Sequence, residues 1–328
     1  MVRIAVTGSI ATDHLMVFPG RFTEQLIASQ LERVSLSFLA DGLEVRRGGV
    51  GANIAFGLGR LGLHPLLVGA AGVDFAEYGA WLKAGGVDVG AVRISRSAHT
   101  ARFVCTTDAD HNQIATFYAG AMAEASGIDL AEVAAAAGGL GLVLVGADDP
   151  AAMLRHTAAA RALRVPVAAD PSQQLARLTG EQARALVQGA RWLFTNEYEA
   201  ALISARTGWS RPQILSRVGV WITTLGEGGV DIAAFGRPVL HVPAVPATVI
   251  ADPTGAGDAF RAGFLAGVAW RWPLEQAARL GCALATTVLE SVGTQEYKLL
   301  ASDLLARLAA AYGPAAAAAA EPRLAALS

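Results

Sequence analysis

The chain has 328 residues, of which 53% are hydrophobic and 16% charged, and its formal net charge is −2. This length predicts one large or two modest domains. The composition excludes an intrinsically disordered chain, which needs low hydrophobicity and high net charge. Because the chain has no surplus of basic residues, we expect no nucleic-acid or anionic-lipid partner.

Cysteine content and hydropathy indicate the compartment. Cys105 and Cys282 match neither a disulfide framework nor a zinc motif, so we expect a reduced, cytoplasmic setting. The longest apolar stretch, residues 133–147, contains four glycines and is shorter than the ~18 residues that a membrane span needs. We therefore expect no membrane partner.

Six short apolar runs, each bounded by turn residues, predict buried β-strands at 2–7, 65–69, 142–146, 166–169, 192–195 and 218–225. Segments with helical periodicity lie between them, at 52–61, 151–163, 181–187 and 197–206. Alternating buried strands and amphipathic helices predict a doubly wound α/β fold with a mostly parallel sheet. Such a sheet binds ligands at the carboxyl ends of its strands, and polar residues lie at or after the end of every run: Ser9 and Asp13, Asp74, Asp148, Asp170, Asn196 and Thr224. They form a functional rim, or they are simply the polar ends of strands.

Two stretches, 15–47 and 100–118, break this alternation. They contain strand-like runs at 34–39, 101–106 and 113–118 with no helix between the last two, which is typical of antiparallel pairing. We predict a small antiparallel β lid, formed by residues 14–47 and 99–118, over the ligand crevice. The large α/β domain then comprises residues 1–13, 48–98 and 119–328, and its alanine-rich tail from 309 is helical or frayed.

The most specific motif is Asp252-Pro-Thr-Gly-Ala-Gly-Asp258, which leads into a helical stretch at 261–269. Two glycines allow a tight turn that brings backbone N–H groups together at a helix N-terminus, where phosphate or a developing oxyanion binds well. Asp258 can then accept the proton of an attacking hydroxyl while Gly255, Ala256 and Gly257 hold the phosphoryl group. The alternative is that Asp258 simply caps the helix.

Other glycine-rich segments are less specific. No Walker-type phosphate loop is present, and Gly57-Leu-Gly-Arg-Leu-Gly62 lies inside a predicted helix, so it indicates close helix–sheet packing and no nicotinamide cofactor. Asn196 and Glu199 are placed to hold magnesium through its waters, or to form a capping box. Residues 223–229 form a nucleotide-phosphate loop or a hairpin turn.

Several motifs occur in the order and spacing of one known family. These are Gly48-Gly-Val-Gly-Ala-Asn53, Asn196-x-x-Glu199, Thr224-Leu-Gly226 and Asp252-Pro-Thr-Gly-Ala-Gly-Asp258. Together they make the chain, from Val2 to about Glu296, resemble the ribokinase (pfkB-type) carbohydrate and nucleoside kinases. Within that family it looks most like the bacterial adenosine kinases, for example at Asp170-Pro-Ser-Gln-Gln174 and Phe117-Tyr-x-Gly-Ala-Met122.

The resemblance implies phosphorylation of the adenosine 5′-hydroxyl by ATP with Mg²⁺, and often a monovalent cation such as K⁺. It implies that Asp258 is the base, that Gly255–Gly257 form the anion hole, and that the lid forms a homodimer contact. The ribose would be held by Asp13, Gly49 and Asn53, with Ser9 and Ser37 in the same pocket, and the purine by Phe103, Phe117, Gln173 and Gln174. ATP and Mg²⁺ would be held by Asn196, Glu199, Thr224, Gly226 and Gly229, and the monovalent cation by Asp252 and Thr254.

The aromatic residues of the lid distinguish a nucleoside substrate from a plain sugar. A purine needs stacking surfaces, worth ~1–3 kcal/mol per base, whereas a plain sugar does not. Phe103 and Phe117 therefore favour a nucleoside over a sugar such as ribose or fructose, and we expect them to sandwich the purine; Phe38 and Tyr118 more simply form the lid's own core or a dimer contact. A third alternative, a non-catalytic nucleoside-binding regulatory protein, does not explain the intact Asp258 motif.

Overall fold

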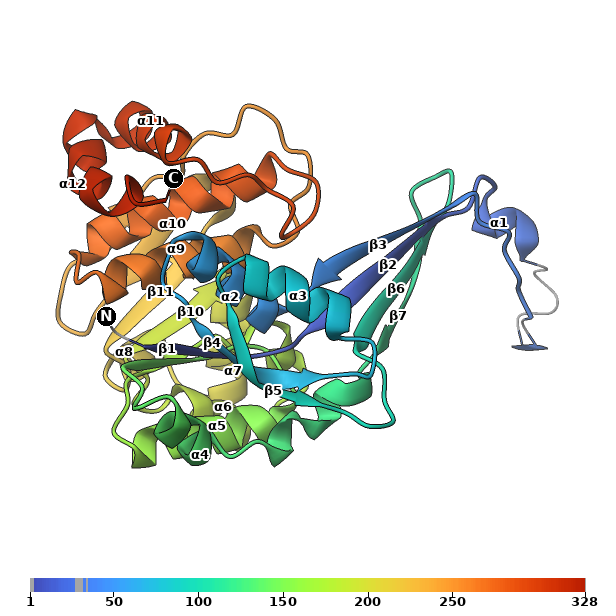
Figure 1. The fold of residues 1–328 in the computed structure, drawn as a ribbon, viewed down its shortest axis with the longest axis horizontal. Coiled ribbons are helices and arrows are strands. Elements are labelled where there is room, and N and C mark those ends of the chain that lie inside the picture. Colours follow the sequence, from blue (N-terminus) through green and yellow to red (C-terminus); the bar gives the residue numbers. More distant parts are fainter. Residues whose placement is uncertain (1–2, 27–31, 34, 328) are drawn as a thin grey trace.

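The computed structural model describes residues 3–26, 32–33 and 35–327. Figure 1 shows a large α/β domain with a narrow sheet projecting from one side. The arrangement matches the predicted fold class, a mostly parallel α/β sheet with a small second sheet as a lid.

Nine strands form the main sheet in the order β13-β12-β11-β10-β9-β8-β1-β4-β5. Their bounds are β1 Ile4–Thr7, β4 Leu66–Ala71, β5 Asp88–Ile94, β8 Leu142–Val145, β9 Val167–Ala169, β10 Trp192–Asn196, β11 Val220–Thr224, β12 Val230–Ala233 and β13 Leu240–Val242. All neighbours from β11 to β5 pair in parallel, and β12 and β13 are antiparallel. The six predicted strands are present as β1, β4, β8, β9, β10 and β11, with ends that differ from the predicted bounds by no more than two residues. Their carboxyl ends therefore meet at one edge of the sheet.

Helices cover both faces of this sheet, as predicted. One face packs against α2 Val50–Arg60, α3 Ala76–Ala84, α9 Ala256–Ala269, α10 Leu274–Leu289, α11 Ala301–Tyr312 and α12 Pro314–Leu324. The other face packs against α4 Leu130–Ala136, α5 Pro150–Ala162, α6 Gly180–Val187, α7 Glu197–Thr207 and α8 Arg211–Leu215. Short 3-10 helices occur at η2 Gly120–Gly127, η3 Ser172–Ala176 and η4 Gly226–Gly228. The four predicted helices are α2, α5, α6 and α7, and the alanine-rich tail is helical.

Gly57 allows α2 to pack closely against another helix. A Cβ atom at this position would lie 2.6 Å from Cβ of Ala262 on α9, which is closer than two carbon atoms can approach. The expected helix–sheet packing is therefore wrong in one respect, because the close partner is another helix. This contact places α2 and α9 side by side with their N-termini at the same edge of the main sheet.

The projecting sheet has the order β3-β2-β6-β7, with β2 Ala11–Val17, β3 Gly42–Gly48, β6 Ala101–Thr107 and β7 Gln113–Tyr118. The two outer pairings are antiparallel, as expected, but the central β2–β6 pair is parallel. The parallel pair arises because β2 and β6 both enter the sheet directly from the large domain. Asp74 anchors this junction: its carboxylate accepts hydrogen bonds from Thr100 and Arg102 at 2.7 Å each.

The strand predicted at 34–39 is wrong for residues 35–39, which form no strand, and Val34 lies outside the described residues. Phe38 in this segment packs on Phe18 and Phe22, each with ring centroids 4.9 Å away, near α1 Phe22–Gln25. Phe38 therefore belongs to a small core at the outer end of the lid. Across the described residues, none of the helices combines the length and the apolar character that a membrane crossing requires.

Candidate active site

Two cavities adjoin at the carboxyl edge of the main sheet. The first, of about 440 Å³, lies where the lid meets this edge, and the second, of about 610 Å³, lies over the ends of β10 and β11. Four residues line both cavities: Val50, Gln173, Gly255 and Asp258. A ligand in each cavity would therefore meet the other at the Asp258 carboxylate.

Helix α9 begins at this meeting point. Its N-cap is Gly255, so the helix starts five residues earlier than the predicted 261, and Asp258 lies in its first turn. The capping alternative for Asp258 is wrong, because the N-cap is Gly255 and no side chain of the described residues caps the helix. The Oδ2 of Asp258 instead accepts a hydrogen bond from Asn53 Nδ2 at 2.8 Å. The first N–H groups of a helix have no partner within the helix and carry the positive end of its dipole, so this N-terminus favours an anion.

Gly255 is required at the N-cap for two reasons. Its φ angle of +79° lies in the left-handed region, and a Cβ atom there would approach Cγ2 of Thr294 to 2.8 Å. Any side chain would therefore displace the start of α9 away from residues 293–295. Gly255 thus keeps the start of α9 open to both cavities.

The Asp258 carboxyl is buried, and burial raises its pKa to about 7. The bond from Asn53 and the positive charge of Arg261 oppose this rise in pKa. Asn53 is itself held through its Oδ1, which accepts hydrogen bonds from Thr294 and Gln295 at 2.9 Å each. A carboxyl whose pKa lies near neutrality and whose orientation is fixed is suited to accept a proton from a hydroxyl.

Arg261 is a residue that the sequence analysis missed. It is almost completely buried on α9, where its Nε lies 2.6 Å from Oδ2 of Asp170 and its Nη1 donates to the carbonyl of Gly257 at 3.0 Å. Its Nη2 lies 3.8 Å from Oε2 of Glu199. Arg261 therefore connects the turn at Gly255–Asp258, which we call the anion-binding turn, to the residues that follow β9 and β10. A lone arginine in an apolar helix, three residues after Asp258, was the available signal for a buried ion pair.

Most of the predicted substrate residues line the first cavity: Ser9, Asp13, Gly49, Asn53, Phe103, Phe117, Gln173 and Gln174. Ser37 does not line it and lies beside Phe38 in the lid. Asp13 on β2 is partly buried, and burial raises the pKa of its carboxyl to about 6. Arg177 also lines this cavity, close in sequence to Gln173 and Gln174, and the sequence analysis gave it no role.

Phe103 and Phe117 both line the first cavity from the lid, and the sandwich of a purine between them stays a prediction. They are direct cross-strand partners on β6 and β7, and such partners project from the same face of a sheet with Cβ atoms about 5 Å apart. Two residues placed in this way both contribute to one wall of the first cavity. The lid therefore supplies a single apolar surface, with η3 contributing polar residues to the same cavity.

The second cavity contains four of the predicted nucleotide residues: Asn196, Glu199, Thr224 and Gly226. Gly229 does not line it and instead packs against the end of β13. The capping-box alternative for Asn196 and Glu199 is realised, because each side chain accepts a hydrogen bond at 2.8 Å from the backbone N–H of the other. Burial raises the pKa of Glu199, whose Oε1 accepts a hydrogen bond from Ser172 at 3.3 Å.

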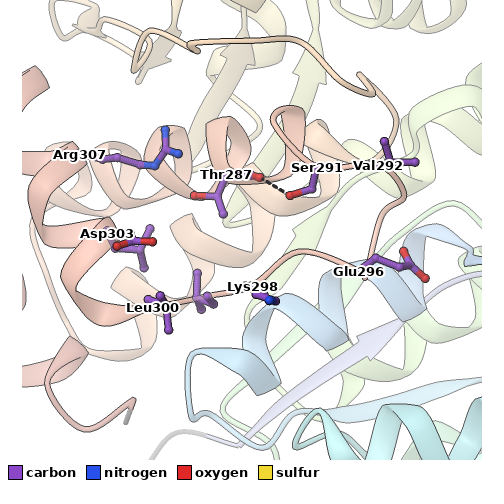
Figure 2. A pocket seen from close by; sticks show the side chains of 10 residues that line it. Thr287, Ser291, Val292, Glu296, Lys298, Leu300, Asp303 and Arg307 are labelled. Atoms are coloured by element: carbon purple, nitrogen blue, oxygen red, sulfur yellow. Dashed lines mark hydrogen bonds between the residues drawn. The ribbon is translucent and has the colours of Figure 1, made fainter.

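A third cavity, of about 410 Å³, lies between α10, residues 291–300 and α11 (Figure 2). It shares no lining residue with the other two cavities, so it is separate from the Asp258 site. In Figure 2 the Ser291 hydroxyl donates to the carbonyl of Thr287, within the end of α10. Ser291 is therefore turned toward α10, whereas the backbone N–H of Gly293 donates to Asp252 at 3.1 Å.

A carboxylate at a helix N-terminus, reached from two cavities, is the arrangement of an enzyme that transfers an anionic group between two ligands. The comparisons with known proteins agree with this class. The family model for pfkB family carbohydrate kinases matches residues 7–300. The chain belongs to this family of kinases.

Relatives and solved structures give further detail. The chain is 32% identical over 251 residues to a nucleoside kinase of Methanothermobacter thermautotrophicus, covering 76% of this chain and 80% of that protein. It resembles the structure of Burkholderia thailandensis nucleoside kinase in complex with inosine, at 34% identity and a TM-score of 0.82, over 94% of this chain and 98% of that one. A ribokinase from Cryptococcus neoformans, at 24% identity and a TM-score of 0.75 over 90% and 96% of the two chains, shares the fold.

Proposed function

We propose that this kinase transfers the γ-phosphoryl group of ATP to the 5′-hydroxyl of a purine nucleoside, with adenosine as substrate and AMP as product. The observation that carries the proposal is the first cavity, which is bounded by the Phe103–Phe117 wall and opens at Asp258 onto the second. The relatives named nucleoside kinase support the substrate class. One of the solved structures is that of the Burkholderia thailandensis enzyme in complex with ADP-inosine.

Each part of the site has a role in this reaction. Asp258 accepts the proton of the 5′-hydroxyl as it attacks, and the N-terminus of α9 stabilises the negative charge on the transferring phosphoryl group. Asn53 orients the Asp258 carboxylate. The lid covers the first cavity and keeps out water, which would otherwise compete with the hydroxyl for the phosphoryl group.

Magnesium fits the second cavity in one specific way. Among the described residues, no three carboxylate, imidazole or thiolate groups converge on one point. Mg²⁺ commonly keeps several waters and binds through one or two carboxylates and substrate phosphates. Glu199 is the residue we propose to orient those waters, and the ion would neutralise charge on the ATP phosphates.

A nucleoside with a 6-oxopurine base is the second candidate substrate. The guanidinium of Arg177, which lines the first cavity, is a pure hydrogen-bond donor and would favour an oxygen acceptor on the base. The side-chain amides of Gln173 and Gln174 can each donate or accept, so they suit either a 6-amino or a 6-oxo group. The inosine complex of the Burkholderia thailandensis enzyme agrees with this alternative.

We also propose that the protein is a cytoplasmic homodimer that associates through the lid. The outer strands of the lid sheet, β3 and β7, expose Leu43, Val45 and Ile114. An uncovered strand edge with apolar side chains is prone to pair with a second copy. Light scattering coupled to size-exclusion chromatography measures this directly, and a monomeric mass at micromolar concentration would refute it.

The testing experiment is Mg²⁺-dependent consumption of ATP with adenosine, inosine, ribose and fructose offered separately, and identification of the product by mass spectrometry. Formation of AMP from adenosine at micromolar concentration, with little turnover of either sugar, supports the proposal. Preference for inosine would replace adenosine with a 6-oxopurine nucleoside. Turnover of a sugar without nucleoside turnover would refute the role of the phenylalanine wall, and silence on all four would refute the proposed reaction.

A further inference from the structure

Arg46 links the lid to the loop that precedes the anion-binding turn. It lies on β3, and its Nη1 donates to Oδ2 of Asp252 at 2.8 Å. Its Nε and Nη2 donate to the two carboxylate oxygens of Glu44, at 2.7 Å each. The Arg46 and Asp252 side chains are only 20% and 12% exposed. This pair is therefore mostly shielded from water, in contrast to an ordinary surface ion pair.

Asp252 begins the segment that ends at the N-cap of α9. Its Oδ1 accepts a hydrogen bond from the backbone N–H of Thr254 at 2.9 Å, and its Oδ2 also accepts one from the backbone N–H of Gly293 at 3.1 Å. The Asp252 carboxylate thus fixes residues 252–254 against residue 293. Because Gly255 follows directly and packs on Thr294, the position of Asp252 sets where the anion-binding amides point.

The family resemblance implies a monovalent cation at Asp252 and Thr254, and the residues present do not fit one. Both oxygens of Asp252 are already engaged, and Oδ2 faces a permanently charged guanidinium. A potassium or sodium ion at this oxygen would be repelled by the positive charge of Arg46. Asp13 and Glu296 are the other carboxylates close enough to interact with the guanidinium, and Asp13 is its cross-strand partner on β2.

We propose that Arg46 is a positioning residue that supplies, from the lid, the positive charge at Asp252, so that phosphoryl transfer is independent of monovalent cations. The proposal rests on the kinase reaction proposed above. The guanidinium acts on the turn through Asp252 and does not touch the transferring group. Its loss should therefore lower kcat more than it raises the KM for the nucleoside.

The test compares four proteins in KCl and in choline chloride at equal ionic strength. The wild-type kcat should be the same in both salts. Arg46→Ala should lose about 10- to 100-fold in kcat in choline chloride, the range expected for a hydrogen bond to a charged group. Part of this loss should be recovered on addition of K⁺ or of guanidinium ion, whereas Arg46→Lys should retain most of the activity without either.

Glu44→Gln is the matched control, because it removes the other partner of Arg46 and leaves the contact with Asp252. Its kcat should remain insensitive to K⁺. Thermal unfolding gives a second readout that needs no activity: K⁺ should leave the wild-type Tm unchanged and should raise the Tm of Arg46→Ala.

Three outcomes would overturn the inference. They are a several-fold activation of the wild-type protein by K⁺, an unchanged kcat in Arg46→Ala, and a loss in Arg46→Ala that neither K⁺ nor guanidinium ion restores. If the wild-type protein has no kinase activity on any substrate offered, the proposed function fails. The thermal unfolding experiment then decides the inference by itself, because a K⁺-dependent rise in the wild-type Tm would refute it.

Discussion

Replacing Asp258 by asparagine should make the protein more stable and much less active. Burial raises the pKa of this carboxyl from 3.8 to about 7, so the folded state disfavours its charged form. Each pKa unit corresponds to 1.36 kcal/mol. The charged carboxyl therefore costs about 4 kcal/mol of unfolding free energy above pH 7, about 2 kcal/mol at pH 5 and nothing below pH 3.8, where it is protonated in both states.

Asparagine has the same shape and no charge, so it removes this cost. Its Oδ1 can accept the hydrogen bond that Asn53 now donates to the carboxylate. Urea unfolding should show Asp258→Asn to be more stable than the wild type, by about 4 kcal/mol at pH 8 and about 2 kcal/mol at pH 5. The turnover number should fall by ~10²–10⁴, the usual contribution of a positioned base. Asp41→Asn, an exposed site on the lid, is the control and should change neither quantity.

Three results would refute this reasoning. Equal stability of Asp258→Asn and the wild type at pH 8, or a gain that is the same at both pH values, would show that the carboxyl is not destabilised by burial. Turnover close to that of the wild type would remove Asp258 from the reaction. Loss of activity without the gain in stability would leave Asp258 as the base but contradict the origin of its raised pKa.

Three further predictions concern the same site. In the wild type, kcat/KM for the nucleoside should rise with pH and level off above about 7, because Asp258 must lose its proton to act as base; a profile that is already flat from pH 5 would contradict this. Phe103→Ala should raise the KM for the nucleoside about 5- to 150-fold, the equivalent of ~1–3 kcal/mol of stacking, and leave that for ATP unchanged; equal changes in both constants would count against the apolar wall. Arg261→Met should lower the unfolding free energy by ~3–5 kcal/mol, because the buried carboxylate of Asp170 loses its partner; urea unfolding measures this, and a loss below ~1 kcal/mol would show that the ion pair contributes little.

Six of the nine strands that the structure describes in the main sheet could be predicted because their signals are local, whereas β5, β12 and β13 were not predicted. A buried parallel strand is a continuous apolar run and a covering helix repeats its apolar residues every 3.6 positions, so β1, β4, β8 to β11 and their helices could be predicted from neighbouring residues. The same holds for the turn at Gly255–Asp258, since closely spaced glycines before a helix can be recognised without any knowledge of the fold. The motif therefore located the proposed base, Asp258, and the glycine-rich turn at the start of α9.

In the lid, the pattern of neighbouring residues was not sufficient to predict the structure. Residues 35–39 alternate like a strand but form none, because Phe38 finds its partners in Phe18 and Phe22 at the outer end of the lid. Phe103 and Phe117 were correctly assigned to strands, yet only the register between β6 and β7 shows that they lie side by side. Register depends on pairing between distant segments, so the sequence of either strand alone does not specify it.

The charged contacts of the site were decided by tertiary structure for the same reason. Arg261 meets Asp170, and Arg46 meets Asp252, across 91 and 206 residues of chain. Whether an arginine faces solvent or a buried carboxylate depends on which surfaces the fold brings together. The neighbouring residues in the sequence therefore cannot predict it. The sequence by itself thus determined the layers, the carboxyl edge and the glycine-rich turn at Gly255–Asp258, while folding alone determined which charges surround that turn and hold it in place.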